Sequence, residues 1–291
     1  KYNAQLSCGR VQTPTLAMIM NREQEIKSFK PQKYYGYKIF ATGMNFTWEN
    51  QKGNQRISDK KWAEELGKKL RGHDLVITEV SKKEKKNYAL ELYDLTTLQK
   101  EASKRYGFSP KQTLNIMQSL YEHHKVLTYP RTDSRYLTTD VAETLRERVE
   151  AIAVGPYRSF TNTVLKGKIT PKKSFVNNQK VSDHHAIIPT EQPVILAQLS
   201  VDERKIFDLV VRRFLAVLYP PYEYEQTKIT LECEGETFFA EGNVPLNRGY
   251  KEVTAPDGDE SGKVFPALKE GEVIRDFSLK KTEGKTKPPA R

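Results

Sequence analysis

The chain has 291 residues, of which 37% are hydrophobic and 10% are aromatic. This composition supplies a sizeable core and argues against a disordered chain. Lys and Arg total 48 against 37 Asp and Glu, which gives a formal net charge of +11. The excess of positive charge favours a polyanionic partner, most simply nucleic acid. A basic surface that only keeps the protein soluble is an equal alternative at this point.

Membrane and secretory classes are disfavoured. No apolar run approaches the roughly 20 residues that a membrane helix needs, and the opening "KYNAQLSCGR" lacks the order of a signal peptide. The two cysteines, Cys8 and Cys233, match no metal-binding spacing and are too few for a disulfide scaffold. We therefore expect a cytoplasmic protein with no membrane partner. Because the chain does not open with Met, we expect it to be a piece of a longer protein.

The first part of the chain predicts one helix followed by strands. Thr13 can cap a helix whose first turn holds Pro14, and that helix ends near residue 28. The hydrophobic period then changes to two, and residues 33–49 alternate around a turn at Gly43, which indicates a hairpin. A short helix over residues 58–71 and a strand over residues 74–80 come next.

The middle of the chain, from Asp94 to Tyr219, reads as mostly helical. Each predicted helix opens with a residue that can cap it, and Ser200 with Glu203 forms a capping-box pattern. One helix begins at Asp94 and ends at Gly107. The next begins at Ser109-Pro110 and places Leu114, Met117 and Tyr121 on one face. A third begins at Thr139 and has apolar positions through Ile152.

Strands on both sides of this helical block predict the architecture. The two-residue period returns after Pro220-Pro221 and continues to about residue 280. The simplest fold class is α+β and multidomain, with a β arch domain built from two chain segments and a mostly helical domain inserted between them. The expected bounds are 31–93 and 221–285 for the β-rich domain and 94–220 for the helical domain, with 1–30 and 286–291 outside both.

The stretch "VLTYPRTDSRYL", residues 126–137, carries the most chemistry. Pro130 biases Tyr129 toward an extended backbone, in which residues two apart point the same way, so Tyr129, Arg131 and Asp133 share a face. A phenol has an ordinary pKa of about 10 and needs help to attack at neutral pH. A neighbouring guanidinium can give that help and also hold a phosphate oxygen. A surface tyrosine beside a salt bridge is the alternative.

Asp133 has two possible roles in this pattern. It can orient Arg131, or it can join Ser134 in capping the helix that follows.

Two further clusters add candidate residues. "SDHHAIIPT", residues 182–190, holds His184 and His185, and one imidazole can donate to a phosphate oxygen or assist proton transfer. A structural histidine pair is an alternative, and so is a zinc site, although no third ligand has a suitable spacing. "GRVQTPTLA", residues 9–17, places Arg10 and Gln12 just before a helix N-terminus, where phosphate binds readily.

The blocks "TYPRTDSRYL", "DHHAIIPT" and "GRVQTPTLA" together resemble type IA DNA topoisomerases, and the topoisomerase III branch most closely. "TKPPAR", residues 286–291, is similar to another block of that family, and the four blocks occur in the family's order. The resemblance implies that Tyr129 is the nucleophile that forms a 5′-phosphotyrosyl bond with one DNA strand. It also implies that Arg131 positions the scissile phosphate and that His184 is the active-site histidine.

The resemblance further implies a single-stranded DNA partner. Arg10 and Gln12 match a block that lines the path of the strand, and Asp133 and Ser134 next to the nucleophile are also expected to contact DNA. We expect an ATP-independent isomerase of bacterial type that acts as a monomer.

One part of the family pattern is missing from the sequence. The family carries an N-terminal Toprim domain that binds Mg²⁺ through a DxD motif and supplies a catalytic glutamate and lysine, and none of these precedes "GRVQ" here. We therefore expect a central fragment that binds no metal itself, with Mg²⁺ held by the missing domain of the whole enzyme. Residues 1–30 would be a helical remnant of the DNA-binding domain next to Toprim, and residues 286–291 the start of a return segment.

Two other functions compete with this interpretation. A fragment that is incomplete for catalysis would act in practice as a single-stranded DNA-binding module. A tyrosine recombinase also uses Tyr, Arg and His, but it needs an Arg-x-x-His spacing and a tyrosine near the C-terminus, and neither is present.

Overall fold

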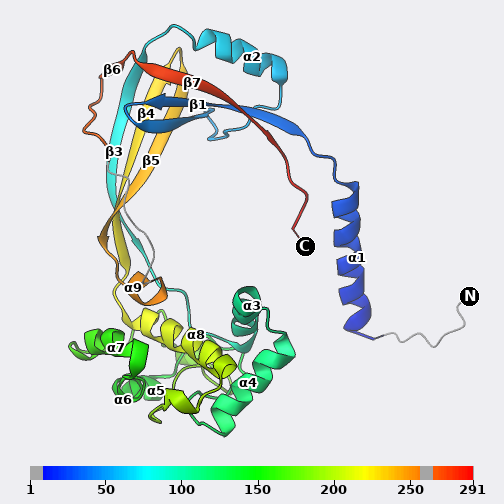
Figure 1. Cartoon of the computed structure of the whole chain (residues 1–291), viewed down its shortest axis with the longest axis vertical. Helices are drawn as coiled ribbons and strands as arrows, with labels where there is room; N and C mark the ends of the chain where they lie inside the picture. The colour runs from blue at the N-terminus through cyan, green and yellow to red at the C-terminus, as the bar shows by residue number, and fades with distance from the viewer. Residues whose placement is uncertain (1–8, 256–264, 291) are drawn as a thin grey trace, which may run out of the picture. The chain divides into compact units, whose positions relative to one another are not determined.

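The structure is a computed structural model of the chain, and it describes residues 9–255 and 265–290 (Figure 1). Its internal contacts divide the chain into two compact units. Unit 1 comprises residues 1–82, 226–242 and 263–291, and unit 2 comprises residues 83–225 and 243–262. Cys8 lies outside the described residues. Cys233 is buried, and burial raises the pKa of its thiol.

A seven-stranded sheet is the main feature of the β-rich part, with the strand order β6-β3-β4-β5-β2-β1-β7 among the described residues. Strands from both ends of the chain meet in it, because β1 pairs antiparallel with β7 from Lys33↔Lys285 to Ala41↔Phe277. This confirms the prediction that early and late strands share one β structure. The strands are β1 (Lys33–Ala41), β2 (Met44–Glu49), β3 (Leu75–Asn87), β4 (Tyr222–Cys233), β5 (Glu236–Asn247), β6 (Val273–Ile274) and β7 (Phe277–Lys285).

The predicted hairpin is present as β1 and β2, which pair antiparallel around a turn at Thr42 and Gly43, both with positive φ. Alternate residues of β1 are buried, and α2 (Lys60–Lys69) packs against that face. The Tyr37 hydroxyl donates to the Ala63 carbonyl at 2.6 Å. A side chain at Gly67 would collide with the Tyr37 ring, so the helix needs glycine there to approach the strand.

Helix α1 (Gln12–Ser28) begins two residues earlier than predicted. Its N-cap is Val11, which makes no side-chain capping bond, so the predicted cap at Thr13 is wrong. Thr13 lies in the first turn instead, where its hydroxyl accepts the Gly9 backbone N–H at 3.3 Å. No residue of α1 is buried in the structure.

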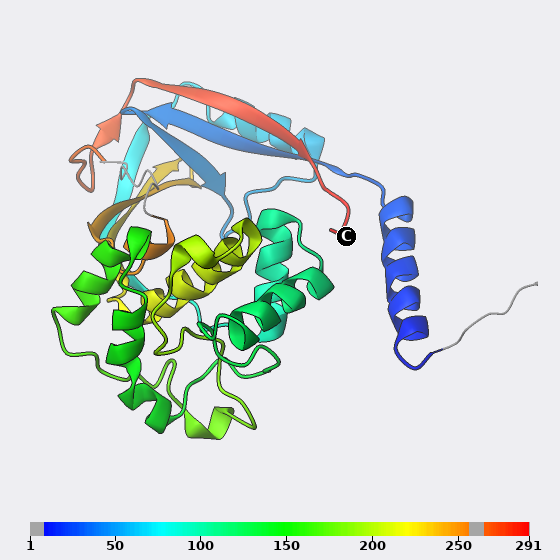
Figure 2. The same cartoon turned by 60° about the horizontal axis from the view of Figure 1, so that its bottom comes forward.

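Unit 2 is mostly helical and is built around α8 (Val201–Leu218). Nine residues of α8 are buried, including Phe207, Val210 and Phe214 in the centre of the core. The other helices are α3 (Leu95–Tyr106), α4 (Pro110–Glu122), α5 (Thr139–Glu143), α6 (Leu145–Ala151), α7 (Arg158–Leu165) and α9 (Lys251–Thr254), with 3₁₀ turns at Gly155–Tyr157, Asn178–Lys180 and Leu196–Gln198 (Figure 2).

Three predicted helix starts in unit 2 are confirmed by their hydrogen bonds. Asp94 accepts the Thr97 N–H at 2.6 Å, and Ser109 accepts the Gln112 N–H at 3.1 Å. Ser200 and Glu203 form the complete capping box of α8. The predicted stop at Gly107 adopts the left-handed conformation that ends α3.

The helix predicted from Thr139 to Ile152 is two helices, α5 and α6. They meet at Thr144, whose ψ of 3° is not helical. The Thr144 hydroxyl donates to the Val141 carbonyl at 3.0 Å and accepts from Arg148 Nε at 2.8 Å, so a local side-chain bond competes with the helix. The N-cap of α5 is Thr138, so Asp133 and Ser134 do not cap this helix. No helix among the described residues is long and apolar enough to span a bilayer.

Candidate active site

Two segments of unit 2 that are far apart in the sequence lie side by side, residues 126–137 and residues 180–190. Leu127 forms a β-bridge with Pro189. The Thr128 N–H donates to the Ile188 carbonyl at 3.0 Å, and the Ala186 N–H donates to the Tyr136 carbonyl at 2.9 Å. The fold thereby brings together the two clusters that the sequence singled out.

The hydroxyls of two threonines, one on each side of Tyr129 in the sequence, form hydrogen bonds that connect these segments. Thr128 Oγ1 donates to the Ala186 carbonyl at 3.2 Å and accepts the Ile188 N–H at 3.0 Å. Thr132 Oγ1 donates to the His184 carbonyl at 2.8 Å and accepts the Ser134 N–H at 3.1 Å. The second threonine therefore fixes the backbone that carries His184. Sequence reasoning missed both residues, although hydroxyls flanking a tyrosine in "TYPRT" were a visible signal.

The exposure of the segment follows the predicted two-residue period. Pro130, Thr132 and Ser134 are buried, whereas Arg131 and Asp133 are exposed and Tyr129 is half-buried. Tyr129, Arg131 and Asp133 are therefore the more exposed positions, as expected for an extended backbone.

The two polar residues beyond Arg131 already have partners within the protein. Ser134 Oγ donates to the Lys180 carbonyl at 2.8 Å, so this buried hydroxyl is a structural contact. The Asp133 carboxylate accepts from Ser182 Oγ at 3.4 Å, which links it to the histidine segment.

The Tyr129 ring is contacted by two other rings. The His184 ring lies 4.3 Å from it, centroid to centroid, with 38° between the planes. The Tyr121 ring meets it edge-on at 5.5 Å and 82°. Tyr121 belongs to α4, which is anchored in the core by Met117 and Leu120. The side chain of Tyr129 is thus held from two directions by residues from different segments.

The adjacent histidines have different environments. His184 is exposed apart from its contact with Tyr129, whereas His185 is half-buried and its Nδ1 lies 2.8 Å from the Ala186 carbonyl. Burial lowers the pKa of His185, which favours a neutral ring that donates Nδ1–H to that carbonyl. His185 fits the structural alternative, and His184 is the histidine available to a ligand.

A buried arginine, missed by sequence reasoning, supports the end of the histidine segment. Arg148 on α6 donates to the Pro189 carbonyl at 2.8 Å and pairs with Glu191 at 2.6 Å. Its Nε bonds to Thr144, the residue that separates α5 from α6. The break between these helices therefore contributes a partner for the arginine that holds residue 189 in place.

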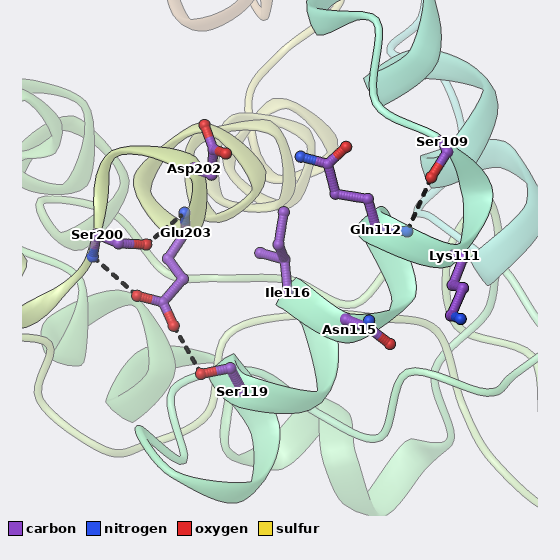
Figure 3. Close-up of a pocket in the computed structure, with 9 residues that line it drawn as sticks. All are labelled: Ser109, Lys111, Gln112, Asn115, Ile116, Ser119, Ser200, Asp202 and Glu203. Atoms are coloured by element: carbon purple, nitrogen blue, oxygen red, sulfur yellow. Dashed lines mark hydrogen bonds between the residues drawn. The ribbon is translucent and has the colours of Figure 1, made fainter.

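A pocket of about 530 Å³ lies in unit 2 between α4 and the start of α8 (Figure 3). Figure 3 shows Glu203 at its wall, where the carboxylate accepts from Ser119 Oγ at 2.6 Å and from the Ser200 N–H at 2.8 Å. His124 Nε2 lies 3.3 Å from the same carboxylate. These bonds connect α4, which carries Tyr121, to α8 in the core. Tyr129 and His184 are not among the residues that line the pocket.

Arg10 and Gln12 belong to unit 1, so the site described above does not include them. Arg10 is exposed directly before α1, and Gln12 is the first residue of the helix rather than the residue before it. In the part of the chain that the structure describes, no three His, Cys, Asp or Glu side chains are grouped so that they could hold a metal ion.

Comparison with known proteins gives a consistent result. A family described as DNA topoisomerase matches residues 1–291. DNA topoisomerase 3 of Bacillus licheniformis is 50% identical over 297 residues, and that of Bacillus subtilis is 49% identical over 298 residues. Each match covers 100% of this chain but 41% of the relative, so the chain spans less than half the length of these proteins.

A solved structure supports the same relationship at the level of the fold. Full-length topoisomerase I from Thermotoga maritima superimposes with a TM-score of 0.74 at 26% identity, over 100% of this chain and 47% of that one. Together with the four sequence blocks, these matches show that the chain belongs to the DNA topoisomerase family.

Proposed function

We propose that the complete protein cuts and rejoins one DNA strand through Tyr129, so that another strand can pass. The phenolic oxygen attacks a backbone phosphorus, the new tyrosyl–phosphate bond replaces the bond to the 3′ oxygen, and the 3′ oxygen leaves as a hydroxyl. Attack by that hydroxyl reverses the exchange. One phosphodiester replaces another, so the reaction needs positioning and charge stabilisation rather than ATP.

The contact between Tyr129 and His184 is the observation that carries this proposal. It supports a role for His184 in donating a proton to the leaving oxygen or to a phosphate oxygen. Arg131, exposed two residues from Tyr129, is suited to hold the scissile phosphate through two parallel hydrogen bonds. Arg10 and Gln12 at the start of α1, together with Asp133, are proposed to contact the strand away from the reacting phosphate.

The remaining chemistry belongs to segments outside this chain. We propose that Mg²⁺ is bound there, by the acidic domain that precedes "GRVQ" in the family, and that this chain alone does not catalyse relaxation. Residues 31–93 and 221–285 are proposed as one domain and 94–220 as the domain that carries Tyr129. Residues 1–30 would be a helical remnant of a third, DNA-binding domain, and residues 286–291 the start of the segment that returns to it. A monomer that acts on single-stranded DNA in the cytoplasm is part of the same proposal.

A covalent-adduct assay tests the central claim. The complete protein is mixed with a labelled single strand and Mg²⁺, quenched with denaturant, and examined for DNA that stays attached to protein. Tyr129→Phe removes one oxygen and keeps the ring, so the adduct should disappear while DNA binding persists. An adduct formed by the Phe variant would show that Tyr129 is not the nucleophile.

The same assay on the 291-residue chain tests whether this chain alone is catalytic or only binds single-stranded DNA. The chain should bind single strands without forming an adduct or relaxing supercoiled DNA. Relaxation by this chain alone would contradict the assignment of the metal chemistry to another segment.

A further inference from the structure

The face of β1 and β7 that lies opposite α2 has an unusual composition. In an antiparallel pair, residues directly opposite each other share a face. The register therefore places Lys38 with Lys280 and Phe40 with Ser278 on the face that α2 does not cover. We call this surface the open face of β1 and β7, and its members are Tyr34, Gly36, Lys38, Phe40, Ser278, Lys280, Thr282 and Gly284.

The open face contains no acidic residue, and it holds two lysines directly opposite each other. Lys38 and Lys280 are both exposed. Like charges directly opposite each other destabilise a sheet. On β2, the residue opposite Lys38 is Thr47, and the residue opposite Phe40 is Asn45, so the next strand brings no carboxylate to these positions. An anionic ligand would relieve the repulsion between the two lysines.

A third cation is held in place on the same face. The Arg56 guanidinium lies 4.7 Å from the centre of the Tyr34 ring. Tyr34 in turn lies against Gly284 on β7, because a Cβ at Gly284 would be 2.4 Å from Tyr34 Cζ. The tyrosine therefore acts as a support for the arginine, which lowers the entropy lost when the guanidinium binds an anion.

An exposed aromatic ring accompanies these cations. Phe40 is 50% exposed although it lies in the middle of a sheet, between strands β7 and β2. It is two residues from Lys38 on the same face, which is a distance of roughly 7 Å. A flat ring stacked on Phe40 would therefore have its attached anionic group within reach of both lysines.

We propose that the open face of β1 and β7 is a second binding surface for single-stranded nucleic acid, separate from strand cleavage at Tyr129. An unpaired base stacks on Phe40, and neighbouring phosphates contact Lys38, Lys280 and Arg56. Stacking rings combined with backbone-tracking cations are how proteins bind single strands without reading sequence. A duplex keeps its bases stacked inside and cannot use Phe40, so the surface selects single strands.

Lysine substitution in the 291-residue chain tests the charge contacts. Binding of a fluorescent thymidine oligonucleotide is measured by anisotropy over a range of salt concentrations. Replacing Lys38 and Lys280 by Ala removes two phosphate contacts, so the slope of log affinity against log salt should become less negative by about 1.4. At about 0.1 M salt this corresponds to a roughly 25-fold loss of affinity.

The same two strands supply a matched control. Lys33 and Lys285 are also directly opposite each other but point to the other face, since they alternate with the open-face residues. Replacing this pair by Ala changes the net charge equally and should alter neither slope nor affinity by a comparable amount. Equal losses for the two pairs, or an unchanged slope for Lys38 and Lys280, would overturn the assignment.

The ring contact has its own test. Phe40→Ala should weaken binding roughly tenfold without changing the salt slope, and Phe40→Tyr should bind as the parent does. An oligonucleotide carrying 5-iodouracil should crosslink to Phe40, and crosslinks found only elsewhere would contradict the proposal. Displacement by polyglutamate as readily as by the oligonucleotide would show a general anion surface instead.

Folding and catalysis can be checked separately. Trp48 and Trp62 lie in contact in unit 1 and report on its folding by fluorescence. Tyr129→Phe should leave binding at the open face unchanged, so loss of the covalent adduct in that variant concerns the proposed cleavage alone.

Discussion

The rings of Tyr129 and His184 lie 4.3 Å apart, with 38° between their planes, although they come from separate segments of the chain. The hydrogen bond from Thr132 Oγ1 to the His184 carbonyl holds these segments together three residues from Tyr129. In the proposed reaction the histidine has two possible roles, to fix the phenol through ring contact and to move a proton. The two roles can be separated by substitution.

His184→Ala should lower the rate of strand cleavage by the complete protein roughly 10²–10⁴-fold, because a positioned proton donor contributes about that much. His184→Phe keeps a ring beside Tyr129 but carries no proton, so it should be nearly as slow. Single-turnover cleavage of a labelled strand measures both, with DNA affinity as the control. A Phe variant as fast as the parent would mean that His184 acts only through packing.

Tyr121→Ala should slow cleavage by about two- to tenfold, since an edge-to-face ring pair contributes roughly 0.5–1.5 kcal/mol. Tyr121→Phe keeps the ring that meets Tyr129 at 5.5 Å and should restore the parent rate. The affinity for DNA should not change in either variant. If Phe fails to restore the rate, the hydroxyl of Tyr121 matters and the ring contact is not the reason for its position.

Arg131→Lys keeps the positive charge but loses the planar guanidinium that can hold two phosphate oxygens at once. Cleavage by the complete protein should fall strongly, while single-strand affinity should fall little, because one phosphate contact among several carries part of the binding energy. The comparison needs the cleavage rate and the dissociation constant at one salt concentration. Parallel losses in both quantities would assign Arg131 to general strand binding.

Glu203 should make the stability of unit 2 depend on pH. Burial alone would raise the pKa of this carboxyl, but hydrogen bonds from Ser119 and Ser200 and the nearby His124 lower it to about 2 from an ordinary 4.5. A lowered pKa in the folded state means that the carboxylate stabilises the fold above about pH 4.5. That contribution is lost as the pH falls through about 2.

Glu203→Gln should therefore destabilise unit 2 at neutral pH by about 1–3 kcal/mol and flatten the acid dependence. Asp202→Asn is the matched control, because Asp202 lies in the same helical turn and forms an ion pair with Lys205 near the surface. Hydrogen exchange of the first turns of α8, followed from pH 7 downward, gives the measurement. An equal effect of the two substitutions would remove the special role of the Glu203 network.

Local chemistry explains which parts of the fold were predictable. The caps at Asp94, Ser109 and Ser200 and the hairpin turn at Gly43 depend on neighbouring residues only, and the structure has all of them. The separation of α5 from α6 was missed because it depends on the side-chain bonds of Thr144 to Val141 and Arg148, and Arg148 is itself bound to the Pro189 carbonyl from far along the chain. Periodicity contains no information about such a partner.

The site shows the same division. The alternating exposure of residues 129–134 follows from backbone geometry and was predicted. The position of Tyr121 was not, since helical spacing groups it with Leu114 and Met117 on an apolar face, whereas it is 38% exposed and meets Tyr129. A contact between rings from two elements is a property of the tertiary structure.

The chain between Leu137 and Asn177 forms an excursion whose two ends are hydrogen-bonded to each other. The Leu137 N–H donates to the Phe175 carbonyl at 2.8 Å, and the Asn177 N–H donates back to the Leu137 carbonyl at 2.9 Å. With both ends of the excursion fastened, changes in its length need not move Tyr129 or His184. The exposed loop over residues 170–174 within the excursion could therefore be lengthened or could carry a reporter peptide without moving Tyr129 or His184. Helix α6 is different, because its Arg148 and Val149 support the histidine segment and the core.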